Sequence, residues 1–328
     1  MRAVVAREAG GPEVLVVEEL PDPQPGPGQI LVRVAAAGVN FIDTYRRSGT
    51  YPMEYPHRVG AEGAGTIEAL GDGVTAFAAG DRVAWAEGGP GSYAELVVVD
   101  AAQVVRVPDG LDLETAAALM LQGMTAHYLV TSTFEVGPGH DVLLHAGAGG
   151  VGLLATQLAV ARGGRVVTTV STPEKAALSA AAGAAHTIDY AAMPDLGAEL
   201  PAAVRDLTDG EGVHVVYDGV GRATFEASLD SLRPRGMMVL FGGASGQVPP
   251  LDPQALNRKG SLFLTRPKLG DYLGTRGELE WRAADVLGSA ASGGLAVRIG
   301  GRYPLADAAQ AHRALEGRAT TGKVLVLP

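Results

Sequence analysis

The feature that most constrains this chain is a glycine-rich loop near its middle. Val142–His145 is apolar and predicts a buried strand, and the loop after it, Gly147–Gly152, has the pattern G-x-G-x-x-G. The next residues predict a helix with an apolar face formed by Val151, Leu154 and Leu158. Glycine lets backbone N–H groups approach a pyrophosphate, and the helix N-terminus contributes about half a positive charge. We therefore expect a dinucleotide here; a glycine-rich turn in some other α/β protein is the alternative.

The segments around this loop alternate between strand-like and helical patterns. Such alternation is typical of a doubly wound parallel sheet, the Rossmann arrangement, with helices on both faces. The six candidate strands are Val142–His145, Arg165–Val170, His186–Asp189, Val213–Tyr217, Met237–Phe241 and Ser261–Thr265. The predicted fold class is therefore α/β with a six-stranded parallel sheet.

The first hundred residues have a different pattern. Short β-rich runs are separated by proline- and glycine-rich turns, which predicts a barrel or sandwich with one short helix after Asn40. The tail predicts a helix at Leu305–Glu316 and a strand at Lys323–Leu327, and we expect it to rejoin the first block. The predicted domains are a β-rich domain at 1–121, completed by 267–328, and a nucleotide-binding domain at 122–266.

Charge and cysteine content exclude several function classes. Acidic residues outnumber basic ones 36 to 26, so the net charge is −10 and a nucleic-acid partner is not expected. The chain has no cysteine, which excludes disulfides, thiol nucleophiles and cysteine-ligated zinc. No histidine stands in a metal-ligand spacing, so we expect no metal.

Two stretches without charged residues, 116–134 and 142–161, approach the length of a membrane span. The second contains the glycines of the loop and the first contains Gln122 and several threonines. A buried location in a folded domain explains both better than a bilayer. We expect a cytoplasmic protein without a membrane partner.

The end of the second strand of a Rossmann sheet selects between NAD and NADP. An acidic residue there would accept the ribose 2′-hydroxyl, but this chain has Ser171, Thr172 and, at the start of the next helix, Lys175. Hydroxyl and ammonium groups can bind a 2′-phosphate. The predicted cofactor is therefore NADPH, although a solvent-exposed lysine is the alternative for Lys175.

A second glycine-containing run, Gly317–Lys323, resembles a phosphate-binding P-loop. Val324 stands where a Ser or Thr would hold magnesium, and a helix precedes the run while a strand follows it, the reverse of a P-loop. We therefore expect no nucleotide triphosphate site there.

Motifs along the full length resemble one known family. They are Gly38–Asp43, Ser48–Pro52, Gly60–Gly65, Gly80–Val83, Ala148–Gly152, Val216–Gly221 and Arg318–Gly322. The whole chain resembles the zinc-free quinone oxidoreductases, the zeta-crystallin-like branch of the medium-chain dehydrogenases/reductases. The resemblance implies a GroES-like catalytic domain, a Rossmann domain, NADPH in the cleft between them, and direct hydride transfer to a quinone. It also implies a homodimer formed through the edge strand 261–265.

The resemblance implies specific site residues. Asn40, Tyr45 and Tyr51 are the candidate catalytic residues lining the acceptor cleft, and Asn40 also has the alternative of a helix N-cap paired with Asp43. The candidate cofactor contacts are Gln122, Thr125, Gly147, Gly149, Gly150, Val151, Gly152, Ser171, Thr172, Lys175, Tyr190, Phe241, Gly242 and Arg318. Gln122 stands where close relatives often have lysine, which implies one positive charge fewer at that place. Ala61 replaces the histidine that zinc-dependent relatives carry before Glu62.

Two other functions remain open from the sequence. Sister branches reduce the C=C bond of enals, enones or enoyl thioesters, a reaction that needs a placed proton donor, for which Tyr51 is the candidate. Alternatively, the chain binds NADPH but serves as a structural or RNA-binding protein, as zeta-crystallins can. The net charge of −10 disfavours RNA.

Overall fold

The computed structural model describes residues 1–87, 89 and 91–328. The chain divides into two compact units, residues 1–124 with 272–328, and residues 125–271. The first unit therefore combines both ends of the chain, and the second is a continuous insertion. Each unit is described by itself.

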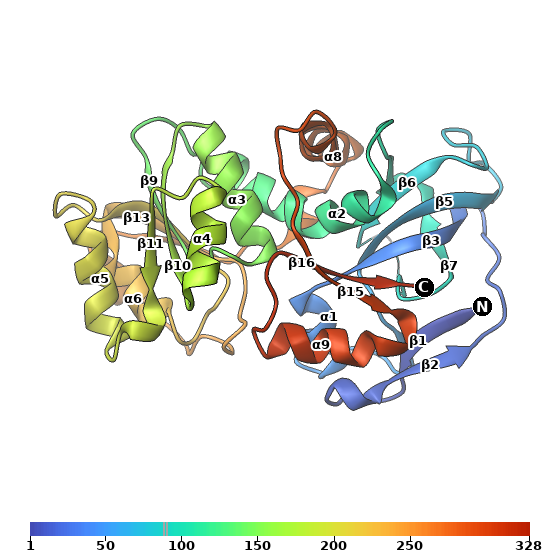
Figure 1. Cartoon of the computed structure of the whole chain (residues 1–328), viewed down its shortest axis with the longest axis horizontal. Helices are drawn as coiled ribbons and strands as arrows, with labels where there is room; N and C mark the ends of the chain where they lie inside the picture. Colours follow the sequence, from blue (N-terminus) through green and yellow to red (C-terminus); the bar gives the residue numbers. More distant parts are fainter. Residues whose placement is uncertain (88, 90) are drawn as a thin grey trace. The chain divides into compact units, whose positions relative to one another are not determined.

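The first unit is built on a seven-stranded sheet and a three-stranded sheet. Strand β3 is the centre of the larger sheet, because it pairs with β5, β7 and β16. The strands are β1 (Arg2–Ala6), β2 (Leu15–Glu19), β3 (Gln29–Val39), β4 (His57–Arg58), β5 (Glu62–Leu70), β6 (Arg82–Ala86), β7 (Leu96–Asp100), β8 (Val104–Arg106), β15 (Ile299–Pro304) and β16 (Lys323–Leu327). The C-terminal β16 thus completes a sheet that begins near the N-terminus (Figure 1).

Local signals set the helices of this unit. Asp112 begins α2 by accepting the backbone N–H of Thr115 at 2.8 Å, and Thr275 and Glu278 form a capping box at the start of α8. The helices are α1 (Phe41–Arg47), α2 (Leu113–Tyr128), α8 (Arg276–Ala291) and α9 (Ala308–Glu316), with short 3₁₀ turns at Pro12–Val14, Ala101–Gln103, Leu269–Tyr272 and Leu305–Asp307. Helix α2 runs across the boundary at residue 124 and continues into a π-helical turn at Leu129–Thr133.

The second unit contains a six-stranded sheet in the order β11-β10-β9-β12-β13-β14, with every neighbouring pair parallel. Numbered along this unit, the order is 3-2-1-4-5-6, the doubly wound arrangement. The strands are β9 (Asp141–Leu144), β10 (Arg165–Val170), β11 (His186–Asp189), β12 (Val213–Asp218), β13 (Leu232–Leu240) and β14 (Phe263–Thr265). The α/β prediction with a Rossmann sheet is confirmed.

Helices cover both faces of this sheet (Figure 1). Helices α5 and α6 pack together on a core that includes Leu200, Val204, Phe225 and Leu229, while α3 and α4 pack together with β10. The helices are α3 (Gly150–Ala161), α4 (Pro173–Ala181), α5 (Leu196–Asp206), α6 (Phe225–Asp230) and α7 (Gln254–Arg258), with a 3₁₀ turn at Tyr190–Ala192. Because β9 pairs in parallel with β10 and with β12, the carboxyl ends of these three strands lie at one edge of the sheet.

Several elements differ from the sequence prediction. The tail contains α8 and β15, which the pattern did not predict, and β13 begins at Leu232, before the predicted start of this strand at Met237. Arg235 lies inside β13 with φ of +63°, and the register of β12 and β13 shifts between Val213 and Val215. No helix among residues 1–87, 89 and 91–328 combines the length and apolar composition that a bilayer crossing requires.

Candidate functional site

The glycine loop, residues 147–152, joins β9 to α3, and four of its six residues are glycine. We call this loop the glycine cradle. An ideal Cβ at Gly147 would lie 2.5 Å from Cβ of Thr168, and one at Gly152 would lie 2.3 Å from the carbonyl oxygen of Ala146. Gly149 is the N-cap residue of α3, so the first turn of that helix presents backbone N–H groups, including those of Gly150 and Val151, at the loop. Both contacts forbid any larger residue in this tight turn, and the N-terminus of the helix that follows is a favourable place for an anion.

Three predicted 2′-phosphate contacts lie together where β10 ends. Thr172 is the N-cap residue of α4 and its hydroxyl accepts the backbone N–H of Lys175 at 3.2 Å. The Lys175 ammonium lies 3.5 Å from the Ser171 hydroxyl. Two hydroxyls and one ammonium therefore stand at a single helix start, a suitable set of donors for a phosphate.

The predicted nicotinamide-side contacts follow β13. The backbone N–H groups of Phe241 and Gly242 donate to the carbonyl oxygen of Asp218 at 2.9 and 3.3 Å. The segments after β12 and β13 pack closely. An ideal Cβ at Gly219 would lie 2.9 Å from the Phe241 ring, and one at Gly242 would lie 2.4 Å from the carbonyl oxygen of Gly219. The turns after β12 and β13 are thus fixed against each other.

A buried polar network lies beneath these turns. The Asp218 carboxylate is fully buried and accepts the backbone N–H groups of Val220 and Gly221, at 2.8 and 2.9 Å. It also accepts the hydroxyls of Thr224 and Ser228, at 2.7 and 2.9 Å. Every lone pair of the carboxylate is therefore engaged, and the turn 219–221 is held in one conformation.

His145 extends this network from β12 to β10. Its Nε2 lies 2.9 Å from the Ser228 hydroxyl and its Nδ1 lies 2.9 Å from the Thr169 hydroxyl. Because Ser228 donates to Asp218, Nε2 carries the proton and Nδ1 accepts from Thr169. Burial lowers the pKa of His145, against a smaller opposing effect of the Asp218 charge, so the ring is neutral.

The first unit contains its own buried polar cluster around Asn40. The Asn40 Nδ2 donates to Glu62 Oε1 at 2.6 Å and to the carbonyl oxygen of Gly38 at 3.3 Å. The Asn40 Oδ1 accepts from Lys323 Nζ at 2.8 Å and from Gln122 Nε2 at 3.3 Å. Lys323 also forms an ion pair with Glu62, whose second oxygen accepts the backbone N–H of Leu121 at 2.5 Å. All four polar positions of the Asn40 amide are therefore occupied.

The sheet register brings these residues together. Asn40 follows β3, Glu62 begins β5 and Lys323 begins β16, and β3 pairs with both of the other strands. Gly38 provides the space, because an ideal Cβ there would lie 2.2 Å from Glu62 Oε1 and 2.6 Å from Lys323 Cε. The glycine of the Gly38–Asp43 motif is thus required by the ion pair.

A chain of hydrogen bonds leads from Asn40 along α1. The Asp43 carboxylate accepts the backbone N–H of Asn40 at 2.9 Å and the hydroxyl of Tyr93 at 3.2 Å. The Tyr93 hydroxyl lies 3.3 Å from His312 Nε2, and His312 Nδ1 lies 3.1 Å from Arg47 Nη1. Asn40 is therefore the N-cap residue of α1 as well as a member of the buried cluster.

Burial shifts the pKa of two groups in this chain in opposite senses. Desolvation raises the pKa of the Asp43 carboxyl to about 7, although the nearby Arg46 charge lowers it. Desolvation and the Arg47 charge lower the pKa of His312 to about 3. Within the described residues, Oδ1 of Asp43 has no hydrogen-bond partner. A carboxyl in this position can hold a proton near neutral pH.

The two predicted acceptor-side tyrosines lie in contact. Their ring centroids are 5.3 Å apart, and the backbone N–H of Tyr51 donates to the carbonyl oxygen of Tyr45 at 3.0 Å. Tyr45 lies on α1 and Tyr51, which is 37% exposed, lies in the loop after it. Tyr51 therefore lies partly exposed at the surface of this unit.

The other predicted contacts are distributed over both units. Thr125 is buried on α2, Tyr190 begins the 3₁₀ turn after β11, and Arg318 is exposed in the loop between α9 and β16. Glu62, Lys323, Asp218 and His145 were missed as site residues by sequence reasoning. The first three lie within or next to motifs that the sequence analysis had singled out, but only the sheet register shows that Glu62 and Lys323 meet.

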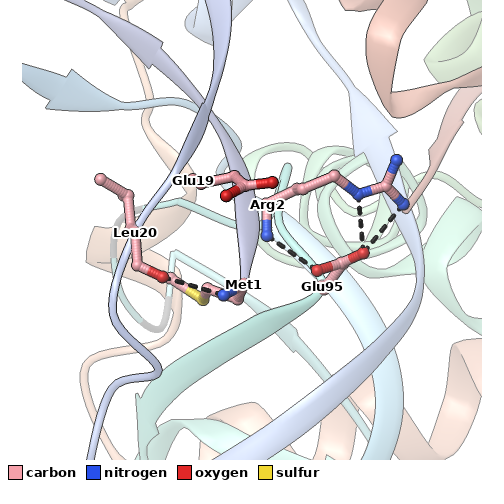
Figure 2. Close-up of a pocket in the computed structure, with 5 residues that line it drawn as sticks. All are labelled: Met1, Arg2, Glu19, Leu20 and Glu95. Atoms are coloured by element: carbon pink, nitrogen blue, oxygen red, sulfur yellow. Dashed lines mark hydrogen bonds and ion pairs between the residues drawn. The ribbon is translucent and has the colours of Figure 1, made fainter.

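One hollow of about 600 Å³ lies apart from all these residues, beside the N-terminus (Figure 2). Its lining groups bond to each other, since Glu95 accepts the backbone N–H and the guanidinium of Arg2 at 2.7 and 2.8 Å. The terminal ammonium donates to the carbonyl oxygen of Leu20 at 2.8 Å. Such a self-satisfied surface is a poor cofactor site. In the described part of the chain, no group of three or more metal-ligating side chains is placed to hold a metal ion.

Comparisons with known proteins agree with this layout. Residues 26–109 match the family model of the alcohol dehydrogenase GroES-like domain, and residues 150–284 match that of the zinc-binding dehydrogenases. The chain is 47% identical to a quinone oxidoreductase of Pseudomonas aeruginosa over 320 residues, which is 97% of each chain. The chain belongs to the quinone oxidoreductases of the medium-chain dehydrogenase/reductase family.

Solved structures of other quinone oxidoreductase family members have the same fold. Mycobacterial Rv1454c complexed with NADPH is 52% identical, with a TM-score of 0.97 and complete coverage of both chains. The quinone oxidoreductase of Escherichia coli complexed with NADPH is 42% identical, with a TM-score of 0.96 and complete coverage of both chains. These similarities confirm the family resemblance that the sequence motifs indicate.

The residues present fit NADPH. In the second unit, Gly147 and Gly152 let the loop turn tightly against Thr168 and the Ala146 carbonyl at the N-terminus of α3, with phosphate donors at Ser171 and Lys175 nearby. In the first unit, Oε1 of Gln122 is buried and has no hydrogen-bond partner among the described residues. An acceptor without a partner is suited to a ligand that carries hydroxyl or amide donors.

Proposed function

We propose that this quinone oxidoreductase family member uses NADPH to reduce quinones. The observation that carries the cofactor assignment is the glycine cradle at Gly147–Gly152 next to the hydroxyl and ammonium donors of Ser171, Thr172 and Lys175. The relatives named quinone oxidoreductase support the acceptor assignment. They do not favour the alternatives of C=C reduction or of a structural or RNA-binding role.

The residues of the second unit bind and orient the cofactor. The backbone of Gly149, Gly150 and Val151 binds the pyrophosphate, and the donors after β10 bind the 2′-phosphate. Phe241 and Gly242 hold the nicotinamide half, and Tyr190 flanks the adenine. Thr125 completes the contacts of this unit, and Arg318 of the first unit adds one more. When bound, NADPH supplies a hydride to the acceptor.

The residues of the first unit position the acceptor. A quinone is electron-poor and gains aromaticity on reduction, so orientation and hydrogen bonding suffice without a strong acid. The Tyr51 phenol is the exposed donor for the developing oxyanion, and Tyr45 packs beside it. Asn40 is held by Glu62 and Lys323, and it contributes to the wall of the site through its fixed position at the start of α1.

A panel of acceptors tests this proposal. NADPH oxidation is followed with simple quinones, with enones and with unconjugated ketones, in wild type and in Tyr51→Phe. We expect turnover with quinones and little with ketones, and a modest loss in Tyr51→Phe. Turnover confined to enones, with a large loss in Tyr51→Phe, would assign the chain to C=C reduction instead.

The same proposal includes a homodimer formed through β14, the edge strand of the six-stranded sheet. Phe263 and Leu264 on this strand are 57% and 37% exposed, unusual values for large apolar side chains. Joining two such edges would cover both side chains and unpaired backbone. Light scattering should give a dimer mass for wild type and for the control Val160→Lys, and a monomer mass for Phe263→Lys. An unchanged mass in Phe263→Lys would exclude this interface.

The proposal also includes a cytoplasmic location, where NADPH is regenerated, and no nucleic-acid partner, because the net charge is −10. Fractionation of cells tests the location. Filter binding at physiological salt tests for a nucleic-acid partner, and tight RNA binding would contradict the proposal that there is none.

A further inference from the structure

An ammonium group and a glutamine amide meet at one oxygen atom in the interior of the first unit. Lys323 Nζ and Gln122 Nε2 lie 2.8 and 3.3 Å from Asn40 Oδ1. Lys323 is 1% exposed, Asn40 is 3% exposed and Glu62 is fully buried. The sequence assigns no role to Lys323, which ends the run that resembles a P-loop. The family resemblance implies that Gln122 leaves the site one positive charge short.

We propose that Lys323 is a positioning residue of the acceptor site, and that its ammonium supplies the positive charge that a lysine at position 122 would supply. Its action is to hold the Asn40 side chain in a single orientation. The kinetic part of this proposal rests on the proposed quinone reductase function.

The orientation follows from the donors and acceptors that face Asn40. An ammonium only donates and a carboxylate only accepts, so the amide oxygen must face Lys323 and the NH₂ group must face Glu62. The reversed amide would place NH₂ against the ammonium and oxygen against the carboxylate. Charge-assisted bonds make this preference stronger than neutral groups would. A glutamine at 323 could donate or accept, so only the Glu62 carboxylate and the Gly38 carbonyl would then favour this orientation.

The position of the cation is set by the buried carboxylate. An unpaired charge at Glu62 would be costly in the interior, so a cation must lie beside it. Gly38 keeps the space for the ion pair open. Gln122 reaches the same oxygen of Asn40 from α2, and a lysine side chain is one bond longer than glutamine. Position 122 can therefore carry the cation in place of 323.

The orientation of Asn40 affects the acceptor-side tyrosines through α1. Asn40 is the N-cap residue of this helix, its backbone N–H is bonded to Asp43, and Tyr45 lies on the same helix in contact with Tyr51. Apart from Arg318, the predicted phosphate contacts of NADPH lie instead in the second unit, on the loop after β9 and at the end of β10. Loss of Lys323 should therefore affect the acceptor more than cofactor binding.

Four proteins test the proposal: wild type, Lys323→Gln, the charge-relocated Gln122→Lys/Lys323→Gln, and the neutral pair Glu62→Gln/Lys323→Gln. For each, we measure the thermal midpoint, the Kd of NADPH, and kcat and KM for 1,4-benzoquinone. The side-chain amide signals of Asn40 in cofactor-free protein, assigned by their loss in Asn40→Ala, report the orientation without any turnover.

In Lys323→Gln, kcat/KM for the quinone should fall by about 10-fold or more while the Kd of NADPH changes by less than about threefold. The relocated variant should restore the Asn40 amide signals, a readout that does not depend on the cofactor contact at position 122. The neutral pair should recover the thermal midpoint but neither kcat/KM nor the amide signals.

Wild-type kcat/KM and amide signals in the neutral pair would overturn the proposal, because the ion pair would then be only structural. The proposal would also be overturned if the relocated variant folds like wild type but does not restore the Asn40 amide signals. If Lys323→Gln does not fold, the neutral pair and the relocated variant still decide the outcome. If wild type oxidises no NADPH with any quinone, the proposed function fails, and the Asn40 amide signals still test the orientation.

Discussion

Ser228 Oγ and His145 Nε2 lie 2.9 Å apart, and this contact joins the helix after β12 to the carboxyl end of β9. His145 Nδ1 contacts Thr169 on β10, the strand that leads to Ser171 and Thr172. The Ser228 hydroxyl also donates to Asp218, whose backbone carbonyl accepts the N–H of Phe241. The two ends of the predicted cofactor site thus share one buried support. A support of this kind keeps both sets of contacts in a fixed mutual position.

Replacing His145 with leucine should weaken this support. The change leaves the hydroxyls of Thr169 and Ser228 without their histidine partner in the interior, which should cost about 1–3 kcal/mol of unfolding free energy. The Kd of NADPH should rise as well. Urea unfolding and a binding titration measure both effects, with the exposed His186→Leu as control. A variant indistinguishable from that control would show that the network does not support the site.

The glycine cradle should not tolerate a methyl group at Gly147. The added Cβ would lie 2.5 Å from Cβ of Thr168 and 2.7 Å from the Ser179 hydroxyl, so the loop must shift. Gly147→Ala should therefore weaken NADPH binding by about 10-fold or more. Gly137→Ala is the matched control, because no described heavy atom lies within 4 Å of its ideal Cβ. Isothermal titration compares the two, and equal affinities would exclude a close approach of the cofactor at Gly147.

Lys175→Ala should discriminate between the two nicotinamide cofactors. A charge-assisted hydrogen bond to phosphate contributes about 1.5–3 kcal/mol, which is about 10- to 150-fold in affinity. The affinity for NADPH should fall by this order and that for NADH should hardly change. Lys268→Ala, at an exposed lysine of the same unit, should change neither. Equal losses for both cofactors in Lys175→Ala would contradict its assignment to the 2′-phosphate.

The pH dependence of stability should contain two opposing contributions from the first unit. The pKa of Asp43 rises from 3.8 to about 7 on folding, so the folded chain binds the extra proton in this range and stability falls as pH rises. The pKa of His312 falls from 6.5 to about 3, so the unfolded chain binds the extra proton and stability increases as pH rises. Between pH 4 and 6.5 the two effects cancel in wild type.

Variants separate these two effects. Asp43→Asn should show unfolding free energy that increases with pH by up to about 1.4 kcal/mol per unit between pH 4 and 6.5. His312→Gln should show a slope of the opposite sign over the same range. Urea unfolding at several pH values measures both slopes. Identical slopes in the two variants would show that neither group is shifted by burial.

The nucleotide-binding unit was predictable because its signals are local. Each strand is a short apolar run, and the glycine loop has a fixed spacing, so the six strands and the positions of Gly147 and Lys175 followed from the sequence. The tail was less predictable. Helix α8 has little apolar periodicity, although the capping box at Thr275 and Glu278 was available as a signal.

The cluster around Asn40 was not predictable from local signals. Glu62 and Lys323 are 261 residues apart, and they meet only because β5 and β16 both pair with β3. A helix N-cap and a site contact were alternatives for Asn40 in the sequence. The structure shows that the residue is the N-cap and that its side chain lies in the buried cluster, two arrangements that are compatible because one uses the backbone N–H and the other uses the amide.

The most direct test of this account compares kcat/KM for 1,4-benzoquinone reduction with NADPH and with NADH, using purified wild-type protein without added metal. The account predicts turnover with NADPH and a preference over NADH of about 10-fold or more, set by the donors at the end of β10. No turnover with any quinone, or equal turnover with the two cofactors, would contradict it.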